Sequence, residues 1–251
     1  MSRIDIFKLK GALFHDTPYQ NLESILKYGI LSRLVRELRG IKAVEDYPPL
    51  VQNNLGRWWI SVFDWWGYYE REWKERKKYW KKLWKSSPEL RRKYPSLKQC
   101  IKRRRNEILR WGKFEKFMEH KLRSLFSCVG SGKVLLVIDP SVEKVRMYEE
   151  KEYKKVYEEA CLNGYEPWRW WDRIPYEDEA LVKGLIPPEK IIGIVVEAKL
   201  NVETAKNKKL KERQTEIAEV AKRVVEICKK FNKPVFDIKG KILWAPPSLD
   251  R

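Results

Sequence analysis

Short apolar runs alternate with longer stretches of helical periodicity along this chain. The runs predict strands, because apolar residues follow one another over only a few positions before a turn signal. The most apolar of them, Lys-Val-Leu-Leu-Val-Ile at 133–138, predicts a buried strand ended by Asp139-Pro140. The other predicted strands lie at residues 12–15, 57–63, 179–186 and 191–196, with a last strand or hairpin around Gly240 at 235–244.

Two segments carry apolar residues on one helical face. Leu22, Ile25 and Leu26 predict a short helix that ends near Gly29, the residue type that most often follows a helix. Residues 203–231 predict a long amphipathic helix, because their apolar residues recur at spacings of three and four. Its apolar face consists of Ile217, Ala221, Val224, Cys228 and Phe231.

A third helical region extends over about residues 65–126. Pro88 and Pro95 interrupt it, and a second helix is expected from about residue 97 to 126. Tryptophan recurs every seven residues in its first part, which places the indoles on one face and favours core packing over a platform for base stacking. These residues are Trp66, Trp73 and Trp80.

The order of the predicted elements indicates the fold class. Strands lie towards both ends of the chain, and a helical block is inserted between them. This order is not a regular β-α-β alternation, so an α+β fold is expected. We expect one domain over residues 1–251, with the helical insertion at about 65–126.

Positive charge is concentrated in this insertion. The chain has a net charge of +19, and residues 71–110 contain 17 Lys and Arg against 4 Glu. Such a concentration favours a polyanion such as nucleic acid, whereas a heat-adapted protein or a solvated helix face is the plainer interpretation. If a nucleic acid binds, its phosphates are expected at Arg103, Arg104 and Arg105 and at Lys77 and Lys78.

The remaining composition excludes several classes of protein. The four cysteines are isolated, with no Cys-x-x-Cys pair and none near a histidine, so a metal site is not expected. The first ten residues have no long apolar segment, and no apolar run of 18 residues exists. We therefore expect a cytoplasmic protein with reduced thiols and no membrane contact.

His15 and Thr17 lie at the end of the first predicted strand. The chain has only two histidines, and residues two apart share one face of a strand. A histidine donor and a threonine hydroxyl so placed can hold a ribose hydroxyl or an amide. The alternative is a histidine satisfied by a backbone carbonyl at the strand end.

Glu177 and Glu179 share a face at the start of a later strand. Such a pair can hold a ribose hydroxyl and stabilise positive charge as a leaving group departs. The alternative is a pair of solvated charges at a strand edge.

An aromatic loop precedes these glutamates. Aromatic rings and guanidinium planes stack on nucleic-acid bases, which suits a loop that holds an extruded or single-stranded base. The residues are Trp168, Arg169 and Trp170, followed by Trp171, and packing in a core is the alternative.

These segments together resemble the ADP-ribosyltransferase superfamily over residues 12–33, 57–63 and 174–196. The pattern His15-x-Thr17, followed by Asn21-Leu22-x-Ser24-Ile25-Leu26-x-x-Gly29-Ile30-Leu31-Ser32, is most similar to the DNA ADP-ribosyltransferase toxins, which modify a base in single-stranded DNA. Residues 64–130 have no counterpart in this resemblance.

The resemblance implies a fold with two small sheets around an NAD cleft. NAD would be the co-substrate, with His15 and Thr17 at the nicotinamide-side ribose and amide and Glu179 as the catalytic glutamate. The other residues implied at the cofactor are Asn21, Ser61, Glu177 and Arg57. Arg33 is the alternative candidate for the role of Arg57. The second strand carries Trp59, Ile60 and Ser61 where many relatives have a tyrosine.

Several functions remain open at this level. The expected reaction transfers ADP-ribose to a nucleic-acid base, and a toxin of this kind would have an antitoxin partner. Glu177-x-Glu179 also matches transferases that modify protein arginine. An RNA 2′-phosphotransferase shares the fold but has no use for a glutamate at this position, and a non-catalytic nucleic-acid-binding protein of a mobile element is the alternative outside enzymes.

Overall fold

A computed structural model gives the arrangement of the chain. It describes residues 9–44, 58–104, 113–129, 132–147, 149–162, 178–198 and 208–247. Within these ranges it is a mixed α and β structure with two sheets, compatible with the expected α+β class.

The larger sheet has eight strands in the order β10-β9-β8-β4-β1-β3-β6-β5, and its neighbours are antiparallel except for β8 and β9. The strands are β1 (Leu13–Pro18), β3 (Trp59–Phe63), β4 (Lys133–Ile138), β5 (Val145–Arg146), β6 (Glu179–Lys183), β8 (Ile191–Val196), β9 (Val235–Asp237) and β10 (Ile242–Trp244). A second sheet pairs β2 (Ile30–Leu31) with β7 (Leu185–Ile186).

The large sheet has a narrow seam between β1 and β3. These strands share a single ladder pair, Phe14 with Phe63, whereas β1 pairs with β4 from Leu13 to Pro18. The expectation of two small sheets therefore needs correction, because the strands join into one sheet of eight and the second sheet has two strands. The seam nevertheless divides the large sheet into a five-stranded and a three-stranded part.

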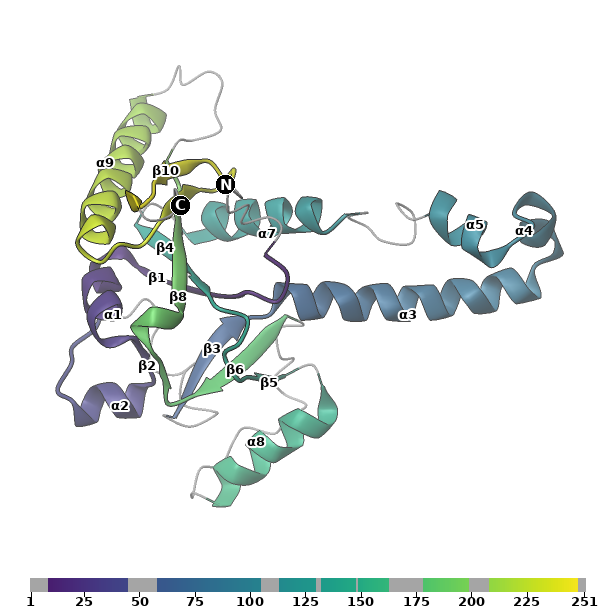
Figure 1. Cartoon of the computed structure of the whole chain (residues 1–251), viewed down its shortest axis with the longest axis horizontal. Coiled ribbons are helices and arrows are strands. Elements are labelled where there is room, and N and C mark those ends of the chain that lie inside the picture. The colour runs from purple at the N-terminus through teal and green to yellow at the C-terminus, as the bar shows by residue number, and fades with distance from the viewer. Residues whose placement is uncertain are drawn as a thin grey trace.

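Helices cover both faces of the sheet (Figure 1). α1 (Leu22–Tyr28) and α9 (Lys208–Lys230) contact each other on one face. α7 (Phe114–Val129) and the first turns of α3 (Trp65–Ser86) pack on the other. Shorter elements complete the body, namely α2 (Arg33–Leu38), α8 (Glu150–Leu162) and the 3-10 turns Tyr19–Asn21 and Pro188–Lys190.

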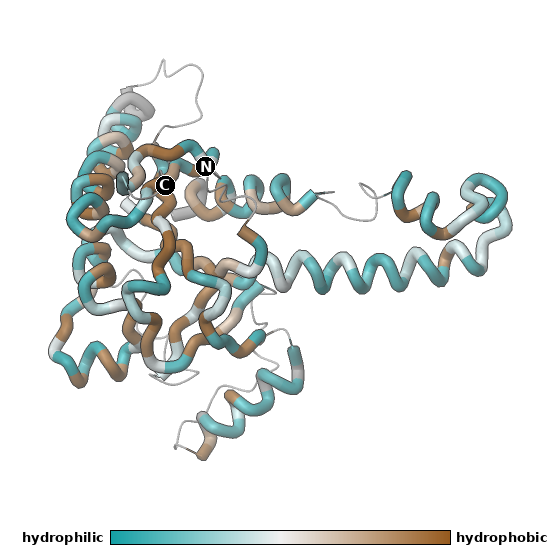
Figure 2. Tube along the Cα trace, in the orientation of Figure 1, coloured by the Kyte–Doolittle hydropathy of each residue, from teal (hydrophilic) through white to brown (hydrophobic). Residues whose placement is uncertain are grey.

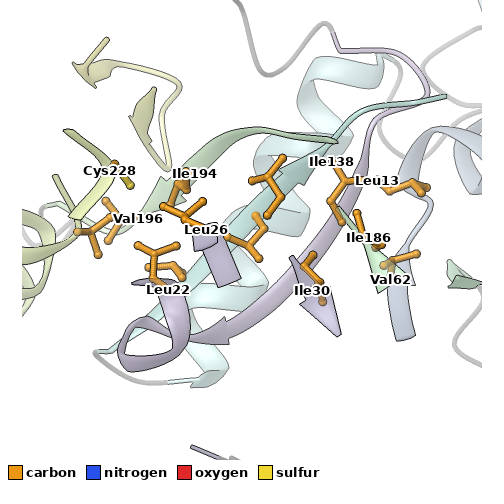
Figure 3. Packing of buried hydrophobic residues seen from close by; sticks show 14 of the residues in the cluster. Leu13, Leu22, Leu26, Ile30, Val62, Ile138, Ile186, Ile194, Val196 and Cys228 are labelled. Atoms are coloured by element: carbon orange, nitrogen blue, oxygen red, sulfur yellow. The ribbon is translucent and has the colours of Figure 1, made fainter. Parts of the chain in front are cut away.

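Alternation along the strands divides the core into two layers. Leu13 points into the layer under α1 and α9, while Phe14 stacks on Trp65 on the opposite face, with ring centroids 4.5 Å apart. Figure 3 shows the first layer, where Leu22 and Leu26 of α1 face the strand residues. β4 contributes to both layers, and its residues 134–138 are buried, as the apolar run predicted.

Residues 65–104 form a helical arm that extends away from the sheet (Figure 1). α3 leads outwards to α4 (Pro88–Lys93) and α5 (Leu97–Arg103), and α7 lies back against the body. Trp84 packs at the far end and donates from Nε1 to the carbonyl of Tyr94 at 3.0 Å. Trp65 of α3 belongs to the buried core of the body, and Trp66 and Trp73 pack against it.

One predicted strand is divided in two. Residues 179–186 form β6 and β7, which belong to different sheets, because Gly184 turns the chain at a φ of 74°. The other predicted strands, the helix ending at Gly29 and the hairpin at 235–244 are confirmed. Among the described helices, none is long and apolar enough to cross a membrane.

Candidate active site

Hydrogen bonds join His15, Ser61 and Glu179 across the seam of the large sheet. The Nδ1 atom of His15 on β1 lies 2.8 Å from the carbonyl oxygen of Ser61 on β3. The hydroxyl of Ser61 donates to Oε1 of Glu179, the first residue of β6, at 2.7 Å. Three residues far apart in the sequence thus form one chain of contacts.

The seam explains why the imidazole of His15, and not a backbone amide of β1, binds the Ser61 carbonyl. Beyond the pair Phe14 and Phe63, no further ladder pair joins β1 to β3. The Ser61 carbonyl, which faces β1, is instead satisfied by the imidazole of His15.

His15 is held as a neutral imidazole. Burial lowers the pKa of His15 below its ordinary value of 6.5 and outweighs the hydrogen bond to Ser61, which raises it. Nδ1 must carry the proton because it faces a carbonyl, so in the neutral ring Nε2 is an acceptor. His15 was expected either to offer a donor to a ligand or to be satisfied by a backbone carbonyl. The structure uses the Nδ1 donor on the carbonyl of Ser61, as in the second alternative, and leaves Nε2 as an acceptor.

Thr17 is held by Asn21. Thr17 is buried, and its hydroxyl accepts a hydrogen bond from Nδ2 of Asn21 at 3.2 Å. The same amide of Asn21 donates to the carbonyl of Val44 and accepts from the amide of Val44, both at 2.8 Å. Asn21 therefore holds the backbone of Val44 beside Thr17, and its contact with NAD stays a prediction.

Glu179 is buried, at 3% exposure, and the residue before it is anchored at two points. The Asp178 carbonyl accepts from the amide of Asp64 at 2.7 Å. The Asp178 carboxylate forms an ion pair with Lys121 of α7, with 2.6 Å between Oδ2 and Nζ. The start of β6, and with it Glu179, is thus fixed to the base of the arm.

Asp64 completes this anchor. It is buried and caps α3, accepting from the amide of Gly67 at 2.9 Å. Its second oxygen accepts from Nε of Arg146 at 3.0 Å. An Asp directly before a helical stretch is a recognisable capping signal. The ion pairs of Asp178 with Lys121 and of Asp64 with Arg146 have no local sequence pattern that would reveal them.

Several predicted site residues fall on parts of the chain that the structure does not describe. They are Arg57, Arg105, Trp168, Arg169, Trp170 and Glu177. Their roles remain predictions.

The structure describes Arg33 and two of the predicted arginines of the arm, Arg103 and Arg104. Arg33 lies in the first turn of α2 and donates to Glu37 at 2.9 Å. Arg103 is exposed at the end of α5. Arg104 instead stacks on Trp80 and Tyr94, 5.4 and 5.7 Å from their ring centroids, so its role includes packing the end of the arm.

No group of three or more His, Cys, Asp or Glu residues within the described ranges could hold a metal ion. A comparison of the chain with models of known protein families and with curated proteins gives no match.

Proposed function

We propose that this protein is an enzyme with the ADP-ribosyltransferase fold that transfers ADP-ribose from NAD to a nucleic-acid base and releases nicotinamide. The observation that supports this most is the hydrogen-bonded chain from His15 through Ser61 to Glu179. The resemblance to that superfamily pointed to these three residues on three separate segments, and the seam brings them together.

Glu179 would supply the main stabilisation of the reaction. Cleavage of the bond between nicotinamide and ribose develops positive charge on the sugar, as in glycoside hydrolysis, and a nearby carboxylate stabilises that charge. The hydrogen bond from Ser61 fixes the orientation of this carboxylate. A fixed carboxylate needs no reorganisation when the charge appears.

His15 and Thr17 would bind the nicotinamide end of NAD. With Nδ1 bound to Ser61, Nε2 of His15 can accept a hydrogen bond from a hydroxyl or from the carboxamide N–H. The Thr17 hydroxyl accepts from Asn21 and retains its own proton for donation. An acceptor and a donor two residues apart suit a group that carries both, as the carboxamide does.

The charge distribution supports a nucleic acid as the acceptor. The chain carries +19, and exposed basic residues crowd the arm that leaves the body next to β6. The loop that contains Trp168, Arg169 and Trp170 would stack the acceptor base, as expected from its composition.

Mass spectrometry of acceptors after incubation with NAD tests this function. Single-stranded DNA, RNA of the same sequence and an arginine-containing peptide would be offered separately to the full chain. We expect an ADP-ribose adduct on an oligonucleotide. An adduct on the peptide alone would contradict the nucleic-acid acceptor, and no adduct together with intact NAD would contradict the whole proposal.

A further inference from the structure

Six lysines lie along one face of α3. Their spacings are three, one, three, one and three residues, which is the repeat that places side chains on a single face of a helix. All six are exposed. They are Lys74, Lys77, Lys78, Lys81, Lys82 and Lys85, and we refer to them as the lysine face.

The lysine face has no partner within the described part of the chain. None of its six ammonium groups makes an ion pair or a cation–π contact with another described residue. Glu72 lies on a different side of the helix, where it pairs with Arg76 at 2.8 Å. Trp80, on which Arg104 stacks, lies on a third side. Trp84, which donates to the carbonyl of Tyr94, lies at the edge of the lysine face, seven residues after Lys77.

The position of α3 leaves this face accessible. α3 projects from the body as a single straight rod, and most of its residues along the projecting part are hydrophilic (Figures 1 and 2). The lysine face extends over eleven residue steps, or about 17 Å at the rise of an α-helix. Duplex DNA carries one charge per ~1.7 Å, so this length of duplex presents about ten phosphates.

A nucleic acid fits this face better than a membrane does. Membrane-surface helices insert large apolar residues beside their lysines. Of the exposed large hydrophobic residues in the described structure, only Tyr79 belongs to the arm. A rigid row of cations without an apolar face matches a linear row of phosphates.

We propose that the lysine face of α3 binds the phosphodiester backbone of a nucleic acid along its length. This surface is distinct from His15, Ser61 and Glu179, and its binding does not require NAD. It also differs from the expected contact at Arg104, which stacks on aromatic rings. Because phosphate contacts carry no sequence information, the arm would hold the strand without selecting the base.

The test replaces Lys77, Lys78, Lys81 and Lys82 by glutamine, which has a similar helix propensity. Affinity for a labelled single strand and for a duplex would be measured across a range of salt concentrations. Each lost contact lowers the salt slope by about 0.9 for a duplex and about 0.7 for a single strand. We therefore expect a fall of about 3–4 in the slope and at least tenfold weaker binding at low salt.

Two variants serve as controls. Glutamine at Lys151, Lys154, Lys155 and Lys222 removes the same charge from exposed positions outside the arm and should leave the slope nearly unchanged. Arginine at the four arm positions keeps the charge and should restore binding. Equal losses in both glutamine variants would overturn the proposal, because net charge alone would then explain them.

Two further measurements, binding to other polyanions and release of nicotinamide, separate the remaining outcomes. Binding to phosphatidylserine vesicles or to polyglutamate, with none to nucleic acid, would also overturn the proposal. Nicotinamide release without nucleic acid should be the same in the parent and in the glutamine variant of the arm. The salt-dependent binding assay therefore tests the proposal for the lysine face, and nicotinamide release separately tests the proposed enzymatic reaction.

Discussion

His15 makes folding sensitive to pH in a definite direction. Burial lowers the pKa of His15 below 6.5 in the folded protein, so the unfolded chain binds the proton more tightly. The contribution of His15 to stability is complete above about pH 6.5 and is lost as the pH falls towards its folded pKa. Protonation would also turn Nε2 into a donor and remove the acceptor proposed for NAD.

We predict that His15→Asn flattens the dependence of the unfolding free energy on pH between about 8 and 5. The asparagine amide can still donate to Ser61, but it does not titrate. Urea unfolding across this range measures the effect, and His120→Asn, at the exposed second histidine, is the control. If the two variants show the same pH profile as the parent, His15 is not the titrating group.

Gly29 shows how one residue joins two elements. It ends α1 with a φ of 90°, and a Cβ atom there would lie 2.4 Å from the carbonyl oxygen of Ile186 on β7. The pairing of β2 with β7 therefore requires a residue without a side chain at the end of α1.

We predict that Gly29→Ala destabilises the fold by at least ~2 kcal/mol, the sum of backbone strain and a clash with fixed backbone. Gly184→Ala is a matched control, because Gly184 also has a positive φ but open space around its Cα. Urea unfolding of both variants separates strain from the clash. A loss at Gly29 no larger than at Gly184 would show that β7 can move away.

The ion pair between Lys121 and Asp178 links α7 to the residue directly before β6. Removing one partner leaves a mostly buried charge, and since Lys121 is 30% exposed we expect Lys121→Met to cost about 1–3 kcal/mol. The double variant with Asp178→Asn should recover part of this loss. A double-mutant cycle by urea unfolding measures the coupling, and additive losses would mean that the pair contributes nothing.

The local elements were predictable where burial produces a regular pattern. The run at 133–138 predicted β4 because its residues are buried on both faces, and the stripe from Ile217 to Cys228 predicted α9 because one face packs on the sheet. The division at Gly184 was missed, since it depends on a turn and on pairing with β2, which lies far away in the sequence.

The candidate site was predictable only in part. His15, Ser61 and Glu179 were identified through a resemblance on separate segments, and their contacts follow from the seam of the sheet. The anchor formed by Asp64, Lys121 and Asp178 was not predicted, because ion pairs between distant residues leave no periodic signal.

At the scale of the whole molecule, the candidate site and the arm share a boundary. The body holds the seam with Glu179, and the arm begins at Asp64, whose amide binds the carbonyl of Asp178 directly before Glu179. A nucleic acid bound along α3 would therefore be held on a helix whose base adjoins the proposed catalytic residue. The basic arm and the buried glutamate are parts of one structure.

Nicotinamide release from NAD, measured for the parent, Glu179→Gln and Glu219→Gln, tests the central claim most directly. Glutamine at position 179 keeps the size of the side chain but removes its negative charge. That charge would stabilise the positive charge on the ribose as nicotinamide leaves, so we expect a rate of nicotinamide release about 100- to 1000-fold lower. Glu219 is exposed on α9, and its variant should match the parent. Equal release by all three proteins, or none by the parent, would contradict a catalytic role for Glu179.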